Sequence, residues 1–259
     1  MSSTLAIQIG QLARRSVLRT LRQPAQIVPA LVFPLFLLAV NAGGLNEATK
    51  LPGFPTDSYL TFALAITFMQ GAMFALMNAG TDLANDVETG FLNRLALTPL
   101  RGSALLTGML SGVLVLGFVQ ALTYLLVGLT AGAHVAAGFG GVLVIFALSF
   151  LMTLGFGAIG SAAALRTGSG EAVQGLFPLF FVFIFLSSSN LPRNLLHTGW
   201  FHTVATWNPI SYLIEGLRSL VITGWDATAL ARGIGVGIAV LLLSLWGASR
   251  SLATRMERT

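Results

Sequence analysis

Six long runs of apolar residues limit most strongly what this chain can fold into. An α-helix rises about 1.5 Å per residue, so roughly 20 apolar residues cross the ~30 Å hydrocarbon core of a bilayer. Only 9% of the 259 residues are charged, against roughly 25% in soluble domains, so the chain lacks the polar surface that water requires. The sequence therefore predicts an all-α integral membrane protein, with one transmembrane domain over residues 1–259. Its six spans are expected at about 25–42, 59–80, 104–130, 138–165, 172–190 and 228–249.

The basic residues indicate how these spans are oriented, because Lys and Arg concentrate in the cytoplasmic loops of membrane proteins. An even number of spans places both termini on one side, and that side would carry most of the 14 basic residues. We therefore expect a multi-pass protein of the plasma (inner) membrane with cytoplasmic termini, a six-span core at 25–249 and a tail at 250–259. The basic residues expected on the cytoplasmic side are Arg14, Arg15, Arg19, Arg22, Arg94, Arg101, Arg166, Arg250, Arg255 and Arg258; those expected outside are Lys50, Arg193, Arg218 and Arg232.

The segment before the first span is basic and amphipathic. Within residues 1–24, a helix over 5–23 would place Arg15, Arg19 and Arg22 on one stripe and apolar side chains on another. This pattern is typical of a helix that lies in the membrane interface, where Arg meets anionic headgroups. The alternative is a solvated tail that only adds positive charge to the cytoplasmic side.

The predicted cytoplasmic loop at about 81–103 is polar, but it contains a short amphipathic helix. Phe91, Leu92 and Leu95 would share one face of this helix, and Pro99 would end it. Such a helix is too short to span the membrane, and an exposed apolar face usually meets a partner.

The predicted external segment at about 187–227 is apolar but broken by Pro192 and Pro209. We expect short re-entrant helices here, because non-helical backbone at membrane depth must be buried in protein. Glu215 and Arg218 are three residues apart on one helical face, so we expect them to pair and to fix this hairpin.

Several kinds of chemistry lack their sequence signatures. A P-loop needs Gly-Lys-Ser/Thr, but Lys50 is the single Lys and stands between Thr49 and Leu51. The chain has no Cys, and its three His residues lack metal-binding spacing, so we expect neither a metal site nor a cofactor. Gly168-Ser169-Gly170 predicts a turn and not a nucleophile, because no His within a span could activate the serine. We expect no catalytic residue.

Two stretches resemble the ABC type-2 exporter permeases. Residues 86–101 (DVETGFLNRLALTPLR) are similar to that family's cytoplasmic loop between the second and third spans. Residues 185–192 (FLSSSNLP) and 207–220 (WNPISYLIEGLRSL) are similar to its external signature after the fifth span, in the daunorubicin and multidrug resistance branch.

The resemblance implies a half-transporter whose ATP and Mg²⁺ are bound by a separate ABC ATPase. Two permeases, as a homodimer or with a close paralogue, would pair with two ATPase copies. A coupling helix would insert Phe91, Leu92 and Leu95 into the ATPase, with Glu88, Arg94 and Arg101 as rim contacts. The residues of the external hairpin would be Asn208, Pro209, Glu215 and Arg218.

The resemblance also implies ATP-driven export of a lipophilic or amphipathic substrate, such as a drug, an antibiotic or a lipid-like molecule. The first, second and fifth spans would line the path, where Phe177, Phe181 and Phe185 could contact the substrate or simply pack or face lipid. Two alternatives stay open, a membrane-embedded lipid-modifying enzyme and an uncoupled channel or scaffold. No nucleic acid partner is expected, because the basic residues form no groove-sized patch.

Overall fold

The computed structural model describes residues 2–96, 102–196 and 199–256, and in this part of the chain the regular structure is entirely helical. The protein is therefore an all-α integral membrane protein, as the sequence predicts. The elements are α1 (Ser2–Leu21), α2 (Pro24–Gly44), η1 (Asn46–Lys50), α3 (Tyr59–Glu88), α4 (Phe91–Ala96), α5 (Gly102–Thr130), α6 (Gly138–Thr167), α7 (Gly170–Phe185), η2 (Arg193–Leu195), α8 (Trp200–Trp207), α9 (Pro209–Ile222) and α10 (Ala227–Met256).

Five of these helices are long and apolar enough to cross a bilayer: α2, α3, α5, α6 and α10. The sixth expected span corresponds to α7, which has 16 residues and ends at Phe185 instead of about residue 190. At about 1.5 Å per residue, α7 is roughly 24 Å long, so it covers most but not all of the hydrocarbon core.

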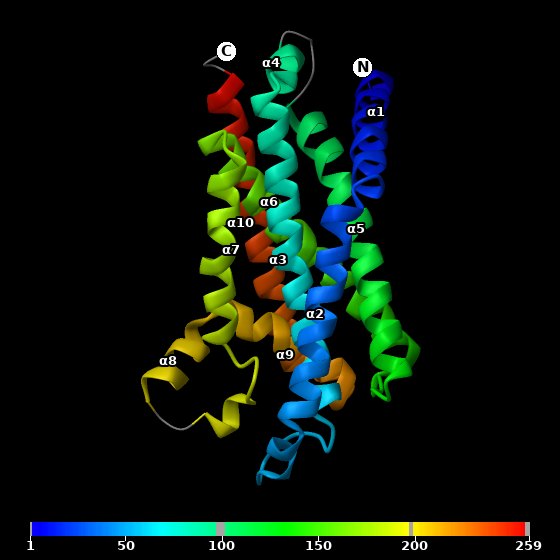
Figure 1. Ribbon diagram of the computed structural model, residues 1–259, viewed down its shortest axis with the longest axis vertical. Helices are drawn as coiled ribbons and strands as arrows, with labels where there is room; N and C mark the ends of the chain where they lie inside the picture. Colours follow the sequence, from blue (N-terminus) through cyan, green and yellow to red (C-terminus); the bar gives the residue numbers. More distant parts are fainter. Residues whose placement is uncertain (1, 97–101, 197–198, 257–259) are drawn as a thin grey trace.

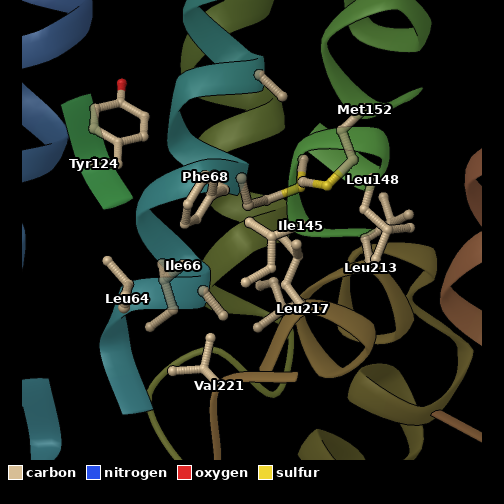
Figure 2. Close-up of a cluster of buried hydrophobic side chains, with 14 of the residues drawn as sticks. Leu64, Ile66, Phe68, Tyr124, Ile145, Leu148, Met152, Leu213, Leu217 and Val221 are labelled. Atoms are coloured by element: carbon tan, nitrogen blue, oxygen red, sulfur yellow. The ribbon is translucent and has the colours of Figure 1, made fainter. Parts of the chain in front are cut away.

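Helix α3 forms the centre of the bundle. Its most apolar stretch is 89% buried inside the protein, compared with 17% for α2 and 22% for α10. Helices α3 and α6 approach so closely that a Cβ on Gly160 would overlap the carbonyl oxygen of Leu76, which explains the glycine. Figure 2 shows the apolar core where α3, α6 and α9 meet, around Phe68, Met152 and Leu217.

Two prolines lie inside α2, yet the helix continues through both. Pro34 has no N–H, so the carbonyl of Ala30 loses its helical partner. The hydroxyl of Tyr124 on α5 donates a hydrogen bond to this carbonyl. The neighbouring helix α5 thus satisfies the carbonyl that Pro34 frees.

The two ends of the bundle differ. Both chain ends and α4 lie at one end, whereas η1, α8 and α9 lie at the other (Figure 1). This arrangement agrees with an even number of crossings. The assignment of the α4 end to the cytoplasm stays a prediction from the basic residues.

The segment expected to form short re-entrant helices does form two short helices, α8 and α9, whereas their entry into the membrane stays a prediction. Asn208 begins α9: its side-chain oxygen accepts from the N–H of Ile210 at 3.0 Å, and Pro209 follows in the first turn. The Asn208 Nδ2 donates to the carbonyls of Phe183 (2.7 Å) and Leu186 (3.1 Å). One side chain therefore both starts α9 and ties it to the end of α7.

Candidate functional site

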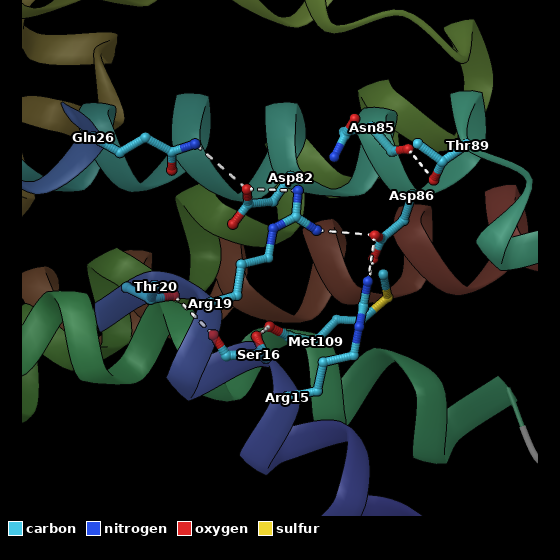
Figure 3. Close-up of polar contacts among 10 residues, drawn as sticks. All are labelled: Arg15, Ser16, Arg19, Thr20, Gln26, Asp82, Asn85, Asp86, Thr89 and Met109. Carbon is cyan, nitrogen blue, oxygen red and sulfur yellow. Dashed lines mark hydrogen bonds and ion pairs between the residues drawn. The ribbon is translucent and has the colours of Figure 1, made fainter. Parts of the chain in front are cut away.

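A cluster of four charged side chains joins α1 to α3 at the α4 end of the bundle. Arg15 donates to both oxygens of the Asp86 carboxylate, at 2.9 and 2.7 Å, and Figure 3 shows this fork. Arg19 bridges Asp86 (2.9 Å) and Asp82 (3.0 Å). Asp86 is only 3% exposed, so its charge depends on these partners.

Helical spacing explains how the cluster assembles. Arg15 and Arg19 are four residues apart on α1, and Asp82 and Asp86 are four apart on α3, so each pair occupies one face of its helix. The hydrogen bond to Asp86 raises the pKa of Arg15 above its usual value, against the opposing effect of burial. Sequence reasoning missed this cluster, although the matching four-residue spacing of opposite charges was a usable signal.

The expected direction of the α1 arginines is wrong for two of the three. Arg15 and Arg19 turn inward to the carboxylates, whereas Arg22 remains exposed, as does Arg14 beside Arg15. Carboxylates at 2.7–3.0 Å offer these guanidinium groups fixed hydrogen-bond partners.

Helix α1 also packs closely against α5. The hydroxyl of Ser16 donates to the carbonyl of Met109 at 2.7 Å and accepts from the N–H of Gly112 at 3.1 Å. The approach is so close that a Cβ on Gly108 or Gly112 would overlap α1. A solvated tail is therefore excluded, and α1 is a packed part of the protein.

The apolar side of α4 faces the protein's own core. The Arg15 guanidinium lies 3.8 Å from the centre of the Phe91 ring, in cation–π geometry. Leu92 is 3% exposed and belongs to a core cluster with Leu83 and Leu252, against which Leu95 also packs. The expectation of an outward apolar face is therefore wrong.

The polar residues around α4 are the ones left outside. Glu88 and Arg94 are exposed, so they remain available to a partner. Arg101, the third expected rim residue, lies outside the described residues. The role of these residues in contacting an ATPase stays a prediction.

The hairpin that contains α9, which is expected to be external, is held by a different pairing from the expected one. Glu215 pairs with Arg193 at 3.0 Å and accepts from the Ser188 hydroxyl at 2.7 Å. Arg218 instead donates to three carbonyls, those of Ser188 (2.8 Å), Ser189 (2.8 Å) and Phe62 (3.3 Å). The predicted Glu215–Arg218 pair is thus wrong, but both residues do fix the hairpin.

The three phenylalanines expected on the substrate path lie together on α7. Phe177 stacks on Phe181 at 5.6 Å between ring centres, and Phe181 contacts Phe185 at 5.3 Å. They also meet Phe74 of α3 (5.3 Å from Phe177) and Phe33 of α2 (6.0 Å from Phe181). The expected three spans therefore share one aromatic cluster, whereas contact with substrate stays a prediction.

The metal and nucleophile candidates can be compared with the part of the chain that the structure describes. There, no group of three His, Asp or Glu side chains could hold a metal ion. Ser169 is the N-cap residue of α7, because its hydroxyl accepts a hydrogen bond from the N–H of Ala172 at 3.3 Å. Its environment is that of a turn, as predicted.

Together the fold and the charged cluster define a multi-pass α-helical membrane protein in which a short loop helix is fastened to a central, buried span. Residues 7–222 match the family described as ABC-2 type transporter, so the chain belongs to that family and is the membrane subunit of an ABC transporter. The resemblance seen in the loop and external motifs is thereby confirmed.

Several relatives carry names that agree with this family. The chain is 27% identical over 255 residues to the putative transport permease ycf38 of Pyropia yezoensis (94% of this chain, 86% of the relative). It is 26% identical over 211 residues to the protein of the same name from Cyanophora paradoxa (81% and 72%). It is also 24% identical over 212 residues to the probable doxorubicin resistance ABC transporter permease protein DrrC of Mycobacterium tuberculosis (81% and 75%).

Proposed function

We propose that this chain is the permease of an ATP-driven exporter that moves a lipophilic or amphipathic compound outward across the plasma (inner) membrane. Two permeases, either identical copies or close paralogues, would assemble with two separate ABC ATPase subunits. ATP and Mg²⁺ would be bound by those subunits, and this chain would hold no cofactor of its own. The name of the DrrC relative supports a drug-like cargo.

The observation that carries the proposal is the position of Arg15. Its guanidinium stacks on Phe91 of α4 and is bound through two hydrogen bonds to Asp86 of α3. A movement of α4 that is driven from the cytoplasm would therefore act on the last turn of α3. Because α3 is the buried centre of the bundle, a displacement there would reach the helices packed around it.

The path of the cargo is supported by the aromatic cluster. Phe177 and Phe181 of α7 meet Phe74 of α3 and Phe33 of α2, and all of these side chains are apolar. Helix α2 is largely unburied within this chain, so its outer face is open to a second permease, to cargo or to lipid. An apolar lining of this kind suits a lipophilic or amphipathic molecule.

The two alternative functions lack a supporting observation. A lipid-modifying enzyme needs polar catalytic groups gathered at one depth. The buried or half-buried charged side chains of the two clusters described above are instead engaged in ion pairs or carbonyl contacts. A channel or uncoupled scaffold would not need α4 to be fastened to α3 and α1 through Arg15.

The test looks for an ABC ATPase in the reading frames next to the permease gene and co-expresses it with the tagged permease. We expect the two chains to co-purify, and ATP hydrolysis in proteoliposomes to rise with some members of a panel of amphiphiles. Arg94→Glu, which reverses an exposed charge on α4, should weaken co-purification.

The matched control is Arg14→Glu, which reverses an exposed charge on α1 and should leave co-purification unchanged. A permease that neither binds the ATPase nor changes its rate of hydrolysis would overturn the proposed function. Deleting residues 91–95 is a poorer test, because the deletion would also remove the core contacts of Leu92.

A further inference from the structure

The turn between α6 and α7, residues 167–171, lies directly beside the last turn of α3. The N–H of Gly170 faces the Glu88 carboxylate at 3.4 Å. Glu88 ends α3, and only Thr89 and Gly90 separate it from the start of α4. The turn therefore lies beside the segment that leads from α3 into α4.

Hydrogen bonds fix the ends of both helices that this turn connects. Gly168 ends α6 with a positive φ of 70°, a conformation that favours glycine, and its N–H donates to Ala164. Arg255 of α10 donates to the carbonyl of Leu165 at 3.0 Å. The hydroxyl of Ser169 caps α7. A force on the turn would therefore pass into α7 and would not be absorbed by loose backbone.

The surface of helix α4 alone is too small to form a stable interface with an ATPase subunit. A stable protein–protein interface buries roughly 800 Å² on each partner, contributed by about 20–30 residues. Helix α4 has six residues, and its apolar side faces the permease core. A partner seated on α4 must therefore also cover neighbouring surface. Thr167 and Glu171 of the adjoining turn are exposed, as are Arg166 and Ala172 on either side of it.

We propose that the α6–α7 turn is a second docking contact for the ATPase, continuous with the α4 contact. The inference rests on the proposed function and deepens it. Through this turn the ATPase acts directly on α7, which carries Phe177 and Phe181. The ATPase then contacts the permease at two places, and it acts on α3 through α4 and Arg15 and on α7 through the turn.

The chain contains no cysteine, so single cysteines can be introduced on a clean background. Thr89→Cys probes the α4 contact, and Thr167→Cys and Glu171→Cys probe the turn. Thr254→Cys is the matched control, because Thr254 is an exposed residue near the end of α10. Each variant is labelled with a maleimide benzophenone, illuminated in the intact complex with the co-expressed ATPase, and blotted for the cross-linked ATPase.

We expect cross-linked ATPase from positions 89, 167 and 171, at yields several-fold above that from position 254. Cross-linking from position 89 alone would overturn the second contact while leaving the proposed function intact. Equal yields from position 254 would show a contact without selectivity and would also overturn the inference. Absence of the product at every position would contradict the proposed function itself.

A second measurement does not depend on cross-linking chemistry. The permease carrying Thr167→Cys or Thr254→Cys is modified with maleimide-polyethylene glycol before the purified ATPase is added. The bulky group on residue 167 should reduce ATPase capture several-fold, whereas the same group on residue 254 should leave it unchanged. Equal capture by the two modified proteins would overturn the proposal.

Discussion

Replacing Arg15 with alanine should uncouple ATP hydrolysis from transport. The substitution removes two hydrogen bonds to Asp86, at 2.9 and 2.7 Å, and the cation–π contact with Phe91. Breaking a fully buried ion pair costs about 3–5 kcal/mol, but the Arg15 side chain is 39% exposed, so water offsets part of that loss. We therefore expect a loss of about 1–2 kcal/mol in the link between α4 and α3.

A loss of that size changes an equilibrium by a factor of roughly 5–30. Transport per ATP hydrolysed should fall by about the same factor in proteoliposomes that contain the permease and its ATPase, while ATPase binding persists. Arg15→Lys should give an intermediate ratio, because lysine keeps the charge but loses the planar two-bond fork and the stacking.

Arg14→Ala is the matched control, since it removes an exposed arginine from the neighbouring position of α1. Its transport per ATP should equal that of the unmodified protein. An Arg15→Ala permease that exports as many molecules per ATP as the unmodified protein would contradict this prediction. The contact between α4 and α3 through Arg15 would then not be needed to couple ATP hydrolysis to transport.

Three further predictions concern packing and the external hairpin. Gly160→Val should abolish membrane abundance, measured by immunoblot, because a Cβ there overlaps the main chain of α3; Gly247→Ala, with open space around it, should not. Tyr124→Phe leaves the Ala30 carbonyl without its donor and should lower thermal stability in detergent by about 0.6–1.7 kcal/mol, and an unchanged melting curve would contradict this. Glu215→Ala breaks the pair with Arg193 and should reduce export more than ATPase binding; normal efflux at equal membrane abundance would refute that role.

The positions of most helices could be predicted from the sequence because bilayer thickness sets a minimum length for an apolar run. The end of α7 could not. The apolar run continues through Leu186, but the helix stops at Phe185. The carbonyls of Ser188 and Ser189 instead accept from Arg218, about 30 residues later in the chain, and no local pattern encodes that contact.

The candidate site illustrates the same limit. Helical periodicity identified correctly which residues share a face of α4, but it could not show that this face meets Arg15 and the core of the same chain. Likewise, a spacing of three residues favoured Arg218 as the partner of Glu215. The structure brings Arg193, 22 residues earlier, within 3.0 Å of that carboxylate.

We propose above that the force for transport comes from a separate ATPase and enters through the α4 end of the permease. The most direct measurement is the efflux of a fluorescent amphiphile from proteoliposomes that contain the permease alone or the permease with its ATPase, each with and without ATP. We expect ATP-dependent efflux only when both subunits are present. Equal efflux by the permease alone would contradict it.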